Sequence, residues 1–373
     1  MTKILHFVTD YPESLSATTT LAVKNLLEST SSTLTHHIVM VDREKHFFCR
    51  QLDNGSYHLG FPRFKFGLFN TTISFLMFLV FIKRFDIWKS VDVVHCHKLT
   101  IDGVFGLFCN LLLGLPYVIS VRGASDEKWL RKKFYAKWIF KMIIQRSAHI
   151  FFVSAFMKNV IHEIFGHLSY RSSQLANISG CEFVPLQNEF SYSNKLLFIG
   201  RLTIWRLKGL DNVIKAIADK PNLSLDIIGG GIDTIEEIKH FAAQLGCQAQ
   251  LNFIGTLPNQ EVKNRLSQYV CLVMPSYPET FGMAYVEALN ANVPVLGSKR
   301  AGITGYVDGK PYIQCIDERD VMQIGTTIER LYREQILIKE MLRNDFPILS
   351  NLFSDVSISN HYTNTMQAFG RAV

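Results

Sequence analysis

The chain has 373 residues, of which 48% are hydrophobic and 19% are charged. This composition is typical of a globular protein with large cores, and the length predicts two domains instead of one. The net charge of +7 favours anionic partners such as phosphates or an acidic lipid surface, whereas the lack of zinc-finger spacing and of aromatic–basic repeats argues against nucleic acid.

Cysteine usage and hydrophobic runs indicate a reducing, cytoplasmic compartment. The seven cysteines are odd in number and scattered, and no two form a C-x-x-C pair, so neither a disulfide framework nor a zinc site is expected. Residues 1–9 are too short for a secretory signal and are typical of a strand. The most hydrophobic run, 71–82, is shorter than the roughly 17–20 residues that a membrane-spanning helix needs.

Strands and helices alternate through the first half of the chain. Strands are predicted at 3–9, 36–41, 92–95, 115–121, 149–153 and 181–185. Helices are predicted at 19–27, at the end of 60–85, at 127–146 and after Ser154. The polar run 187–194 is the predicted linker.

The second half repeats the alternation. Strands are predicted at 195–199, 223–228, 250–254 and 271–274, and helices at 210–218, 236–245, 260–268 and 355–373. Alternation with short connections favours a parallel, doubly wound sheet in each half.

Two helical stretches of the first half have two interpretations. Both 60–85 and 127–146 fit amphipathic or buried helices of a domain core with a solvated basic face. Both also fit contact with an anionic membrane, because basic side chains flank their aromatic and apolar residues. The basic residues are Arg63, Lys65, Lys83, Arg84, Lys133, Lys137 and Lys141.

His95 and His97 alternate about Cys96 at the end of the strand predicted at 92–95. Paired histidines are common metal ligands, but no third ligand is spaced nearby. We therefore expect a hydrogen-bonding role for His95 and no metal.

The stretch 277–297, YPETFGMAYVEALNANVPVLG, combines a loop, a helix at 283–289 and a strand. Glu279 precedes the helix at its positive end, Glu287 lies within it, and Asn292 is placed to end it in a left-handed conformation. At ~100° per residue the two carboxylates do not share one face. Two such carboxylates suit the hydroxyls of a sugar and a ribose, although a capping Glu and a surface Glu would give the same spacing.

This stretch resembles the E-x7-E signature of retaining glycosyltransferases of the GT-B fold, specifically glycosyltransferase family 4. The residues that carry the resemblance are Glu279, Phe281, Gly282, Glu287, Ala288, Pro294 and Gly302. In that family the first Glu binds the transferred sugar of a nucleotide-sugar donor and the second holds the ribose. The implied fold is α/β, with two doubly wound Rossmann-like parallel-sheet domains that face each other across a cleft.

The resemblance extends to the phosphate-binding loops. Gly200-Arg201-Leu202 and Lys208-Gly209 resemble the "G-R-L … K-G" pair in which Arg and Lys clamp the donor diphosphate, with Arg206 as a competitor for the role of Lys208. Arg201 and Lys208 could instead be ordinary loop cations. Gly229 and Gly230 would let a base or phosphate approach closely, and the amide of Gly302 would lie near the donor. The chain has no Asp-x-Asp pair, so no divalent metal is expected.

Two loops of the first half with candidate substrate contacts depart from the family pattern. The usual Gly-Gly pair of the first loop is replaced by 14–18, where the hydroxyl of Ser16 is a candidate substrate contact. The usual "His-Gly" turn is Arg122-Gly123, and an arginine there suits a phosphate or an anionic sugar.

The resemblance implies an acceptor-side domain at 1–186, a donor-binding domain at 187–355 and a C-terminal helix, 356–373, that crosses back to the first domain. The implied activity is retaining transfer of a sugar from a UDP- or GDP-sugar to a glycan or lipid-linked acceptor, in bacterial surface polysaccharide, lipopolysaccharide or glycolipid synthesis. The alternatives are a sugar-nucleotide epimerase of the same fold and a non-catalytic, membrane-associated partner of another transferase.

Overall fold

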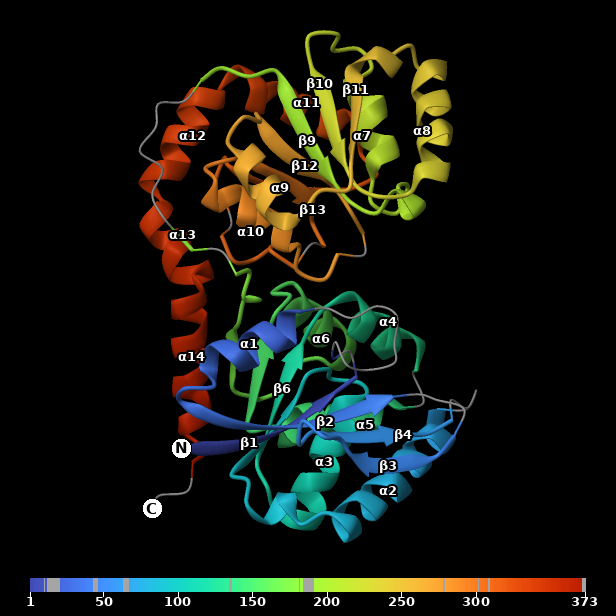
Figure 1. Cartoon of the computed structure of the whole chain (residues 1–373), viewed down its shortest axis with the longest axis vertical. Helices are drawn as coiled ribbons and strands as arrows, with labels where there is room; N and C mark the ends of the chain where they lie inside the picture. The colour runs from blue at the N-terminus through green and yellow to red at the C-terminus, as the bar shows by residue number, and fades with distance from the viewer. Residues whose placement is uncertain are drawn as a thin grey trace. The chain divides into compact units, whose positions relative to one another are not determined.

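The computed structural model describes residues 1–9, 11, 21–42, 46–62, 67–133, 136–180, 182–183, 191–277, 279–300, 302–307 and 309–370. The chain divides into two compact α/β units (Figure 1). Unit 1 comprises residues 1–180 and 355–373, and unit 2 comprises 181–354. The predicted linker 187–194 lies partly outside the described residues. So does most of the strand predicted at 181–185, whose two described residues are not in a strand.

Unit 1 contains one sheet in the order β3-β4-β2-β1-β5-β6-β7-β8. All neighbouring strands are parallel except β3 and β4, which form an antiparallel hairpin that was not predicted. The strands are β1 Thr2–Val8, β2 Leu34–Asp42, β3 Phe48–Gln51, β4 Tyr57–Gly60, β5 Val93–Cys96, β6 Tyr117–Val121, β7 His149–Phe152 and β8 Ser172–Gln174.

The helices of unit 1 are α1 Ala22–Thr30, α2 Gly67–Arg84, α3 Asp102–Leu113, α4 Ala124–Lys132, α5 Lys137–Arg146, α6 Met157–Phe165 and α14 Asp355–Gln367, with a 3₁₀ turn at Ile87–Lys89. The prediction of one helix over 127–146 is wrong, because α4 ends at Lys132 and the backbone of Lys133 has a non-helical ψ of 58°. Helix α14 returns to unit 1 after unit 2 and packs against α1 (Figure 1).

Hydrophobic burial on both faces explains the apolar strands of unit 1. Strands β1, β5 and β6 lie in the middle of the sheet, and their apolar side chains are almost fully buried. Helices cover parallel sheets on both sides, so such strands lack a solvent-facing row. Three polar residues in the interior of these strands, His6, His95 and Ser120, are also fully buried, whereas Lys3 near the start of β1 is exposed.

Unit 2 contains a fully parallel sheet in the order β11-β10-β9-β12-β13-β14. The strands are β9 Lys195–Ile199, β10 Ser224–Ile228, β11 Leu251–Gly255, β12 Cys271–Met274, β13 Val295–Ser298 and β14 Ile313–Ile316. The helices are α7 Leu210–Ile217, α8 Ile232–Gln244, α9 Asn259–Leu266, α10 Met283–Asn290, α11 Val321–Arg333, α12 Gln335–Asn344 and α13 Phe346–Phe353, with 3₁₀ turns at Leu202–Ile204 and Gln248–Gln250. The predicted strands and helices of this half are therefore confirmed, within a few residues at their ends.

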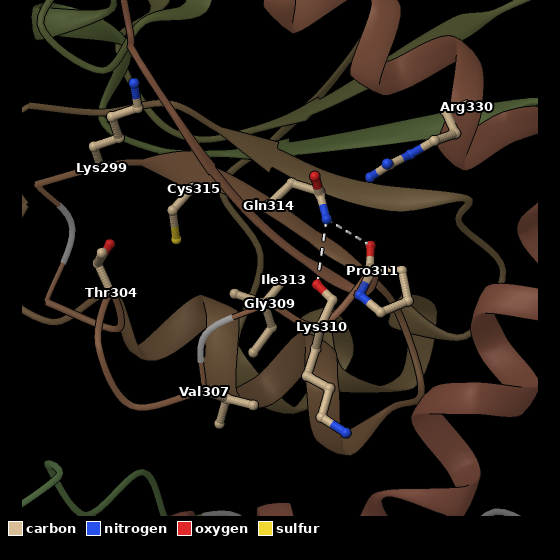
Figure 2. A pocket seen from close by; sticks show the side chains of 10 residues that line it. All are labelled: Lys299, Thr304, Val307, Gly309, Lys310, Pro311, Ile313, Gln314, Cys315 and Arg330. Atoms are coloured by element: carbon tan, nitrogen blue, oxygen red, sulfur yellow. Dashed lines mark hydrogen bonds between the residues drawn. The ribbon is translucent and has the colours of Figure 1, made fainter.

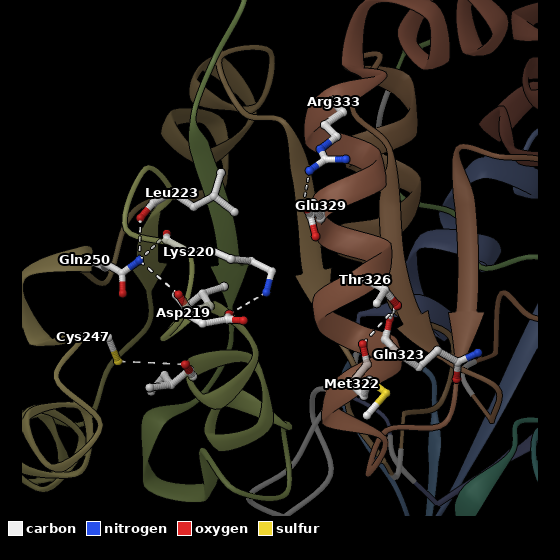
Figure 3. Close-up of polar contacts among 12 residues, drawn as sticks. Asp219, Lys220, Leu223, Cys247, Gln250, Met322, Gln323, Thr326, Glu329 and Arg333 are labelled. Atoms are coloured by element: carbon white, nitrogen blue, oxygen red, sulfur yellow. Dashed lines mark hydrogen bonds and ion pairs between the residues drawn. The ribbon is translucent and has the colours of Figure 1, made fainter.

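Side-chain hydrogen bonds to backbone carbonyls close the amino-terminal edge of this sheet (Figure 3). The amide nitrogen of Gln250 donates to the carbonyls of Ile217, Lys220 and Leu223 at 3.1, 2.6 and 3.1 Å. These bonds tie the turn before β11 to the turn before β10. The loops at the opposite, carboxyl edge are where open α/β sheets bind ligands.

Candidate active site

The strand order of unit 2 creates a switch point between β9 and β12. From β9 the chain proceeds outward through β10 to β11, and it then returns to the other side of β9 to place β12, β13 and β14. Loops that leave two adjacent strands in opposite directions open a crevice at the carboxyl edge. Arg201 follows β9 and Glu279 follows β12, so the fold brings both loops to this point.

Glycines let these loops pack backbone against backbone. A Cβ atom at Gly209 would lie 2.5 Å from the carbonyl oxygen of Pro275, and one at Gly302 would lie 2.0 Å from that of Thr280. A Cβ atom at Gly229 would lie 1.8 Å from the carbonyl oxygen of Gly200. The close approach predicted for Gly229 therefore exists, but the neighbour that requires it is the protein's own backbone.

Lys208 and Glu279 form a partly buried ion pair at the switch point. The Nζ atom of Lys208 lies 2.8 Å from Oε2 of Glu279, and their side chains are only 18% and 15% exposed. The hydroxyl of the buried Ser276 donates to the same Oε2 at 2.9 Å. These contacts hold the carboxylate in one orientation, although 71 residues separate the paired side chains.

Arg206 does not occupy this position. Its Nη2 atom lies 2.9 Å from Oε1 of Glu237, both side chains are about half exposed, and its guanidinium lies over the ring of Trp205. Of the two competing cations, the structure thus brings Lys208 and not Arg206 to Glu279. Arg201 has an exposed side chain at the end of β9.

Glu287 is separate from that ion pair. It lies in α10, is 9% exposed and accepts a hydrogen bond from Nδ2 of Asn259 at 3.3 Å. Burial raises the pKa of Glu287, while the Asn259 bond and the charge of Lys263 act in the opposite direction. The two carboxylates therefore have different neighbours, as their spacing predicts.

The remaining predicted residues of this stretch shape the backbone. Phe281 is 1% exposed and packs against Tyr306 and Phe353, so its ring belongs to the core and not to a ligand surface. Gly282 has a φ of 79° and is the N-cap that precedes α10. In the loop after β10, a Cβ atom at Gly230 would lie 2.8 Å from the hydroxyl of Thr256. The left-handed conformation predicted for Asn292 is confirmed by its φ of 58°.

In unit 1, Arg122 lies at the carboxyl end of β6 and is 7% exposed. Its Nη1 atom donates to Oδ1 of Asn177 at 3.1 Å and its Nη2 atom approaches Nδ1 of His97 at 3.4 Å. Its backbone nitrogen donates to the buried carboxylate of Asp126 at 3.2 Å. Ser16, the other site residue predicted for this half, lies outside the described residues.

His6 joins His95 and His97, which corrects the expectation that no third histidine is near them. One ring nitrogen from each lies within 4.8 Å of the others, a spacing that a metal ion could use. The parallel pairing of β1 with β5 sets His6 beside His95. The sequence did not reveal this, because residues 89 positions apart become neighbours only through the strand order.

The ring nitrogens of these histidines are engaged in hydrogen bonds. Those of His95 contact the hydroxyls of Tyr362 and Ser120 at 2.8 and 2.9 Å. A metal would have to displace such contacts and lie near the guanidinium charge of Arg122, so we assign the histidines to a hydrogen-bonded network. Burial lowers the pKa of His6, His95 and His97 well below the usual value, and the neighbouring histidines lower it further.

A cavity of about 470 Å³ lies along the edge strand β14 (Figure 2). The residues that line it are Lys299, Thr304, Val307, Gly309, Lys310, Pro311, Ile313, Gln314, Cys315 and Arg330. Of the three cations that line it, Lys310 is paired with Asp345 at 2.8 Å. The lining shares no residue with the predicted donor site, so this cavity is distinct from the switch-point cluster.

Two family models match the chain. The model "Glycosyl transferases group 1" matches residues 185–345, and the model "Glycosyltransferase Family 4" matches residues 33–170.

Two curated relatives match over part of their length. An uncharacterized glycosyltransferase of Methanocaldococcus jannaschii is 28% identical over 215 residues, which is 58% of each chain. The O-antigen chain mannosyltransferase RfbU of Salmonella typhimurium is 25% identical over 205 residues, or 54% of this chain and 56% of that protein. The chain thus spans little more than half the length of these relatives.

Solved structures match over the whole chain. A sucrose-phosphate synthase of Thermosynechococcus elongatus superposes with a TM-score of 0.73 at 15% identity, over 99% of both chains. HepE of Anabaena, in complex with UDP, superposes with a TM-score of 0.70 at 13% identity, over 99% of this chain and all of that chain. These neighbours are GT-B glycosyltransferases. With both family models matched in sequence, the chain belongs to the family 4 type of GT-B glycosyltransferases.

Proposed function

We propose that the protein is a retaining glycosyltransferase that moves a sugar from a UDP- or GDP-sugar to an acceptor hydroxyl. The observation that carries the proposal is the Lys208–Glu279 pair, fixed by Ser276 at the switch point of the unit 2 sheet. A carboxylate and a cation held together there suit a ligand with sugar hydroxyls on one side and phosphates on the other.

Each of the candidate site residues would have a separate role in sugar transfer. Arg201 and Lys208 would balance the charge that grows on the departing diphosphate, and the amino end of α10 adds its dipole. Glu279 would accept hydrogen bonds from the transferred sugar and orient it for attack. Glu287 would hold the ribose. A retaining reaction needs no base to activate water, so the Arg122-Gly123 turn is compatible with activity.

Relatives suggest the acceptor class. RfbU is named as an O-antigen chain mannosyltransferase, and a further structural neighbour at 17% identity is a lipopolysaccharide outer core galactosyltransferase. We therefore propose a glycan or lipid-linked acceptor from bacterial surface polysaccharide or glycolipid synthesis. Arg122 would bind an anionic group of a substrate, because a planar guanidinium matches phosphate or carboxylate geometry.

Nucleotide binding and transfer are expected to survive excess EDTA. Two cations and a helix terminus can neutralise a diphosphate without a divalent metal. In a thermal-shift panel of nucleotides and nucleotide sugars, the matching ligand at 100 times its Kd stabilises the protein by about 2.7 kcal/mol. Arg201→Ala and Lys208→Ala should each lose this shift and most of the transfer activity.

Arg206→Ala is the matched control, because Arg206 lies in the same loop but forms an exposed ion pair with Glu237 instead of pairing with Glu279. The Arg206→Ala protein should keep the ligand-induced thermal shift. Loss of binding and activity on chelation, with recovery in Mg²⁺, would contradict the proposed clamp. Conversion of the donor to an isomeric nucleotide sugar without a new linkage would identify an epimerase, and binding without turnover would identify a non-catalytic partner.

We further propose that unit 1 contacts an anionic membrane surface. None of the described helices is both long and apolar enough to cross a bilayer. On neighbouring helices α2, α3 and α5, however, several large apolar side chains are about half exposed or more. They are Leu76, Val80, Leu111, Leu112 and Trp138, and the nearby exposed cations are Lys83, Arg84, Lys137 and Lys141.

Binding to vesicles that contain anionic lipid is expected at low salt and should weaken as salt is added, since charges are screened over ~10 Å at 0.1 M. Leu76→Glu and Trp138→Glu should each weaken co-sedimentation. Met322→Glu is the control, because Met322 is 79% exposed on unit 2. Equal binding by all variants, or no binding by wild type at low salt, would show that these faces are merely solvated.

A further inference from the structure

A continuous chain of hydrogen bonds crosses unit 1 from Arg122 to Thr30. The Nη2 atom of Arg122 lies 3.4 Å from Nδ1 of His97, and Nε2 of His97 lies 3.0 Å from Nδ1 of His6. The Nε2 atom of His6 lies 2.9 Å from Nδ1 of His36, and Nε2 of His36 lies 3.0 Å from the hydroxyl of Thr30. His6 and His36 lie in β1 and β2, and His97 directly follows β5; these three strands are adjacent in the sheet.

The arginine end imposes a direction on this chain. A guanidinium only donates, so Nδ1 of His97 must accept and the proton of a neutral His97 must be on Nε2. That proton is then donated to Nδ1 of His6. The same logic places the proton of His6 on Nε2, where it is donated to His36.

The threonine end imposes the same direction independently. The hydroxyl of Thr30 donates its single proton to the carbonyl of Leu26 at 2.8 Å. It must therefore accept from Nε2 of His36, which makes His36 an Nε2–H tautomer as well. Two unrelated chemical constraints thus agree on one ordered set of tautomers.

The ordered tautomers require each of the three imidazole rings to carry one proton and so to be neutral. Burial favours this neutral form. His6 and His97 are at most 1% exposed. Burial lowers the pKa of both well below the usual value, and it lowers that of His36 to about 4. A second proton on His97 would remove its acceptor and place a positive charge against Arg122.

We infer that His97, backed by His6 and His36, is a positioning residue that holds the guanidinium of Arg122 in one orientation. Asn177 fixes one terminal nitrogen of the guanidinium and His97 fixes the other. The significance of that orientation for substrate rests on the proposed function, in which Arg122 binds an anionic group. The ordered chain itself is independent of it.

The first test measures the histidine tautomers. In the full chain labelled with ¹⁵N-histidine, long-range proton–nitrogen spectra distinguish Nδ1–H from Nε2–H rings, and His→Asn variants assign the signals. His6, His36 and His97 should all be Nε2–H tautomers at neutral pH. A proton on Nδ1 of His97 would overturn the inference, because that nitrogen could not accept from Arg122.

The second test uses the matched variants His97→Asn and His97→Leu, which have similar shapes but differ in the acceptor. In wild type the two terminal nitrogens of Arg122 should give separate ¹⁵N signals, because rotation of the guanidinium is restricted. The signals should merge in His97→Leu and stay separate in His97→Asn, where Oδ1 replaces Nδ1 as the acceptor. Merged signals in wild type, or separate signals in His97→Leu, would overturn the inference.

Substitution of a histidine outside the chain distinguishes a loss of Arg122 positioning from a general loss of stability. His149 is half-buried, contacts the hydroxyl of Ser173 at 2.9 Å and lies outside the chain from Arg122 to Thr30. His149→Leu should leave the Arg122 signals unchanged.

A kinetic measurement then connects the chain to transfer. His97→Leu should raise the KM for the acceptor about tenfold with an unchanged KM for the donor, a usual cost of a lost supporting contact, and His97→Asn should restore it. Equal changes in both KM values would show a structural role only. If the nucleotide panel detects no donor while the spectra behave as expected, the proposed function fails and the positioning chain stands.

Discussion

Replacing Glu279 with glutamine is expected to lower the rate of sugar transfer at least ~100-fold, as removal of one preorganised transition-state contact typically does. The substitution keeps the shape, and the amide oxygen can still accept from Ser276 and Lys208, whose donors lie 2.9 and 2.8 Å from Oε2 of Glu279. The negative charge that orients the sugar and balances Lys208 is lost. The measurement is kcat/KM for transfer, with thermal melting as the test of the fold.

Glu237→Gln is the matched control for this prediction. Glu237 is paired with Arg206 at 2.9 Å, but both side chains are about half exposed, and such surface pairs contribute only about 0–1 kcal/mol. The control should keep kcat/KM within about twofold of wild type, which is ~0.4 kcal/mol. Wild-type turnover by the Glu279→Gln protein on its true substrates would remove Glu279 from the mechanism.

Lowering the pH from 7 to 5 is expected to unfold unit 1. Four histidines, His6, His36, His95 and His97, have pKa values lowered by burial, and that of His36 falls to about 4. In the unfolded chain they titrate near 6.5, so below that pH the unfolded state binds more protons than the folded state. Their contribution to stability is therefore complete above pH 6.5 and is lost as the pH falls toward the folded pKa values.

The expected effect is large because the four groups act together. Each costs about 1.4 kcal/mol of unfolding free energy per pH unit below 6.5, so four cost about 5 kcal/mol per unit. A domain has only about 5–15 kcal/mol in total. The other charged or titratable groups that face these histidines are His37, Arg122, His149 and Tyr362.

Tryptophan fluorescence can follow this transition, since Trp88, Trp129 and Trp138 lie in unit 1 and the fourth, Trp205, lies in unit 2. Denaturant midpoints between pH 7 and 5 give the proton uptake on unfolding. His36→Gln should reduce the uptake by about one proton. A stability that stays flat over this range would mean that the buried histidines are already charged, against the hydrogen-bond directions described above.

The sequence predicted β9 to β13 of unit 2 and the helices that connect them, for physical reasons, but it did not predict β14, α11, α12 or α13. Parallel strands buried on both faces produce short apolar runs between glycine-rich turns, and β9 to β13 follow this pattern. The hairpin of β3 and β4 was missed because each strand has only four residues, although Asn54-Gly55 between them is a hairpin signal. The end of α4 was missed because no proline or glycine interrupts the helical pattern of 127–146.

The candidate site shows the same limit. The roles of Glu279 and Lys208 came from resemblance, whereas their contact across 71 residues became visible only in the fold. The spacing of Glu279 and Glu287 correctly predicted that they diverge. His6 and His36 were missed because periodicity predicts strands but not their order, and only the order β2-β1-β5 gathers the histidines.

The return of α14 to unit 1 makes that unit discontinuous in the chain, which affects how it folds during translation. Two contacts of unit 1 can form only after unit 2 has been synthesised. They are the hydrogen bond of His95 to Tyr362 at 2.8 Å and the packing of α14 on α1. At 5–20 residues per second, the 174 residues of unit 2, 181–354, take roughly 9–35 s to synthesise. During that interval the sheet of unit 1 has emerged without its last helix, while unit 2 receives all of its own elements in sequence. Unit 2 can therefore complete its fold first, whereas unit 1 lacks the helix that packs on α1 until translation has passed α14.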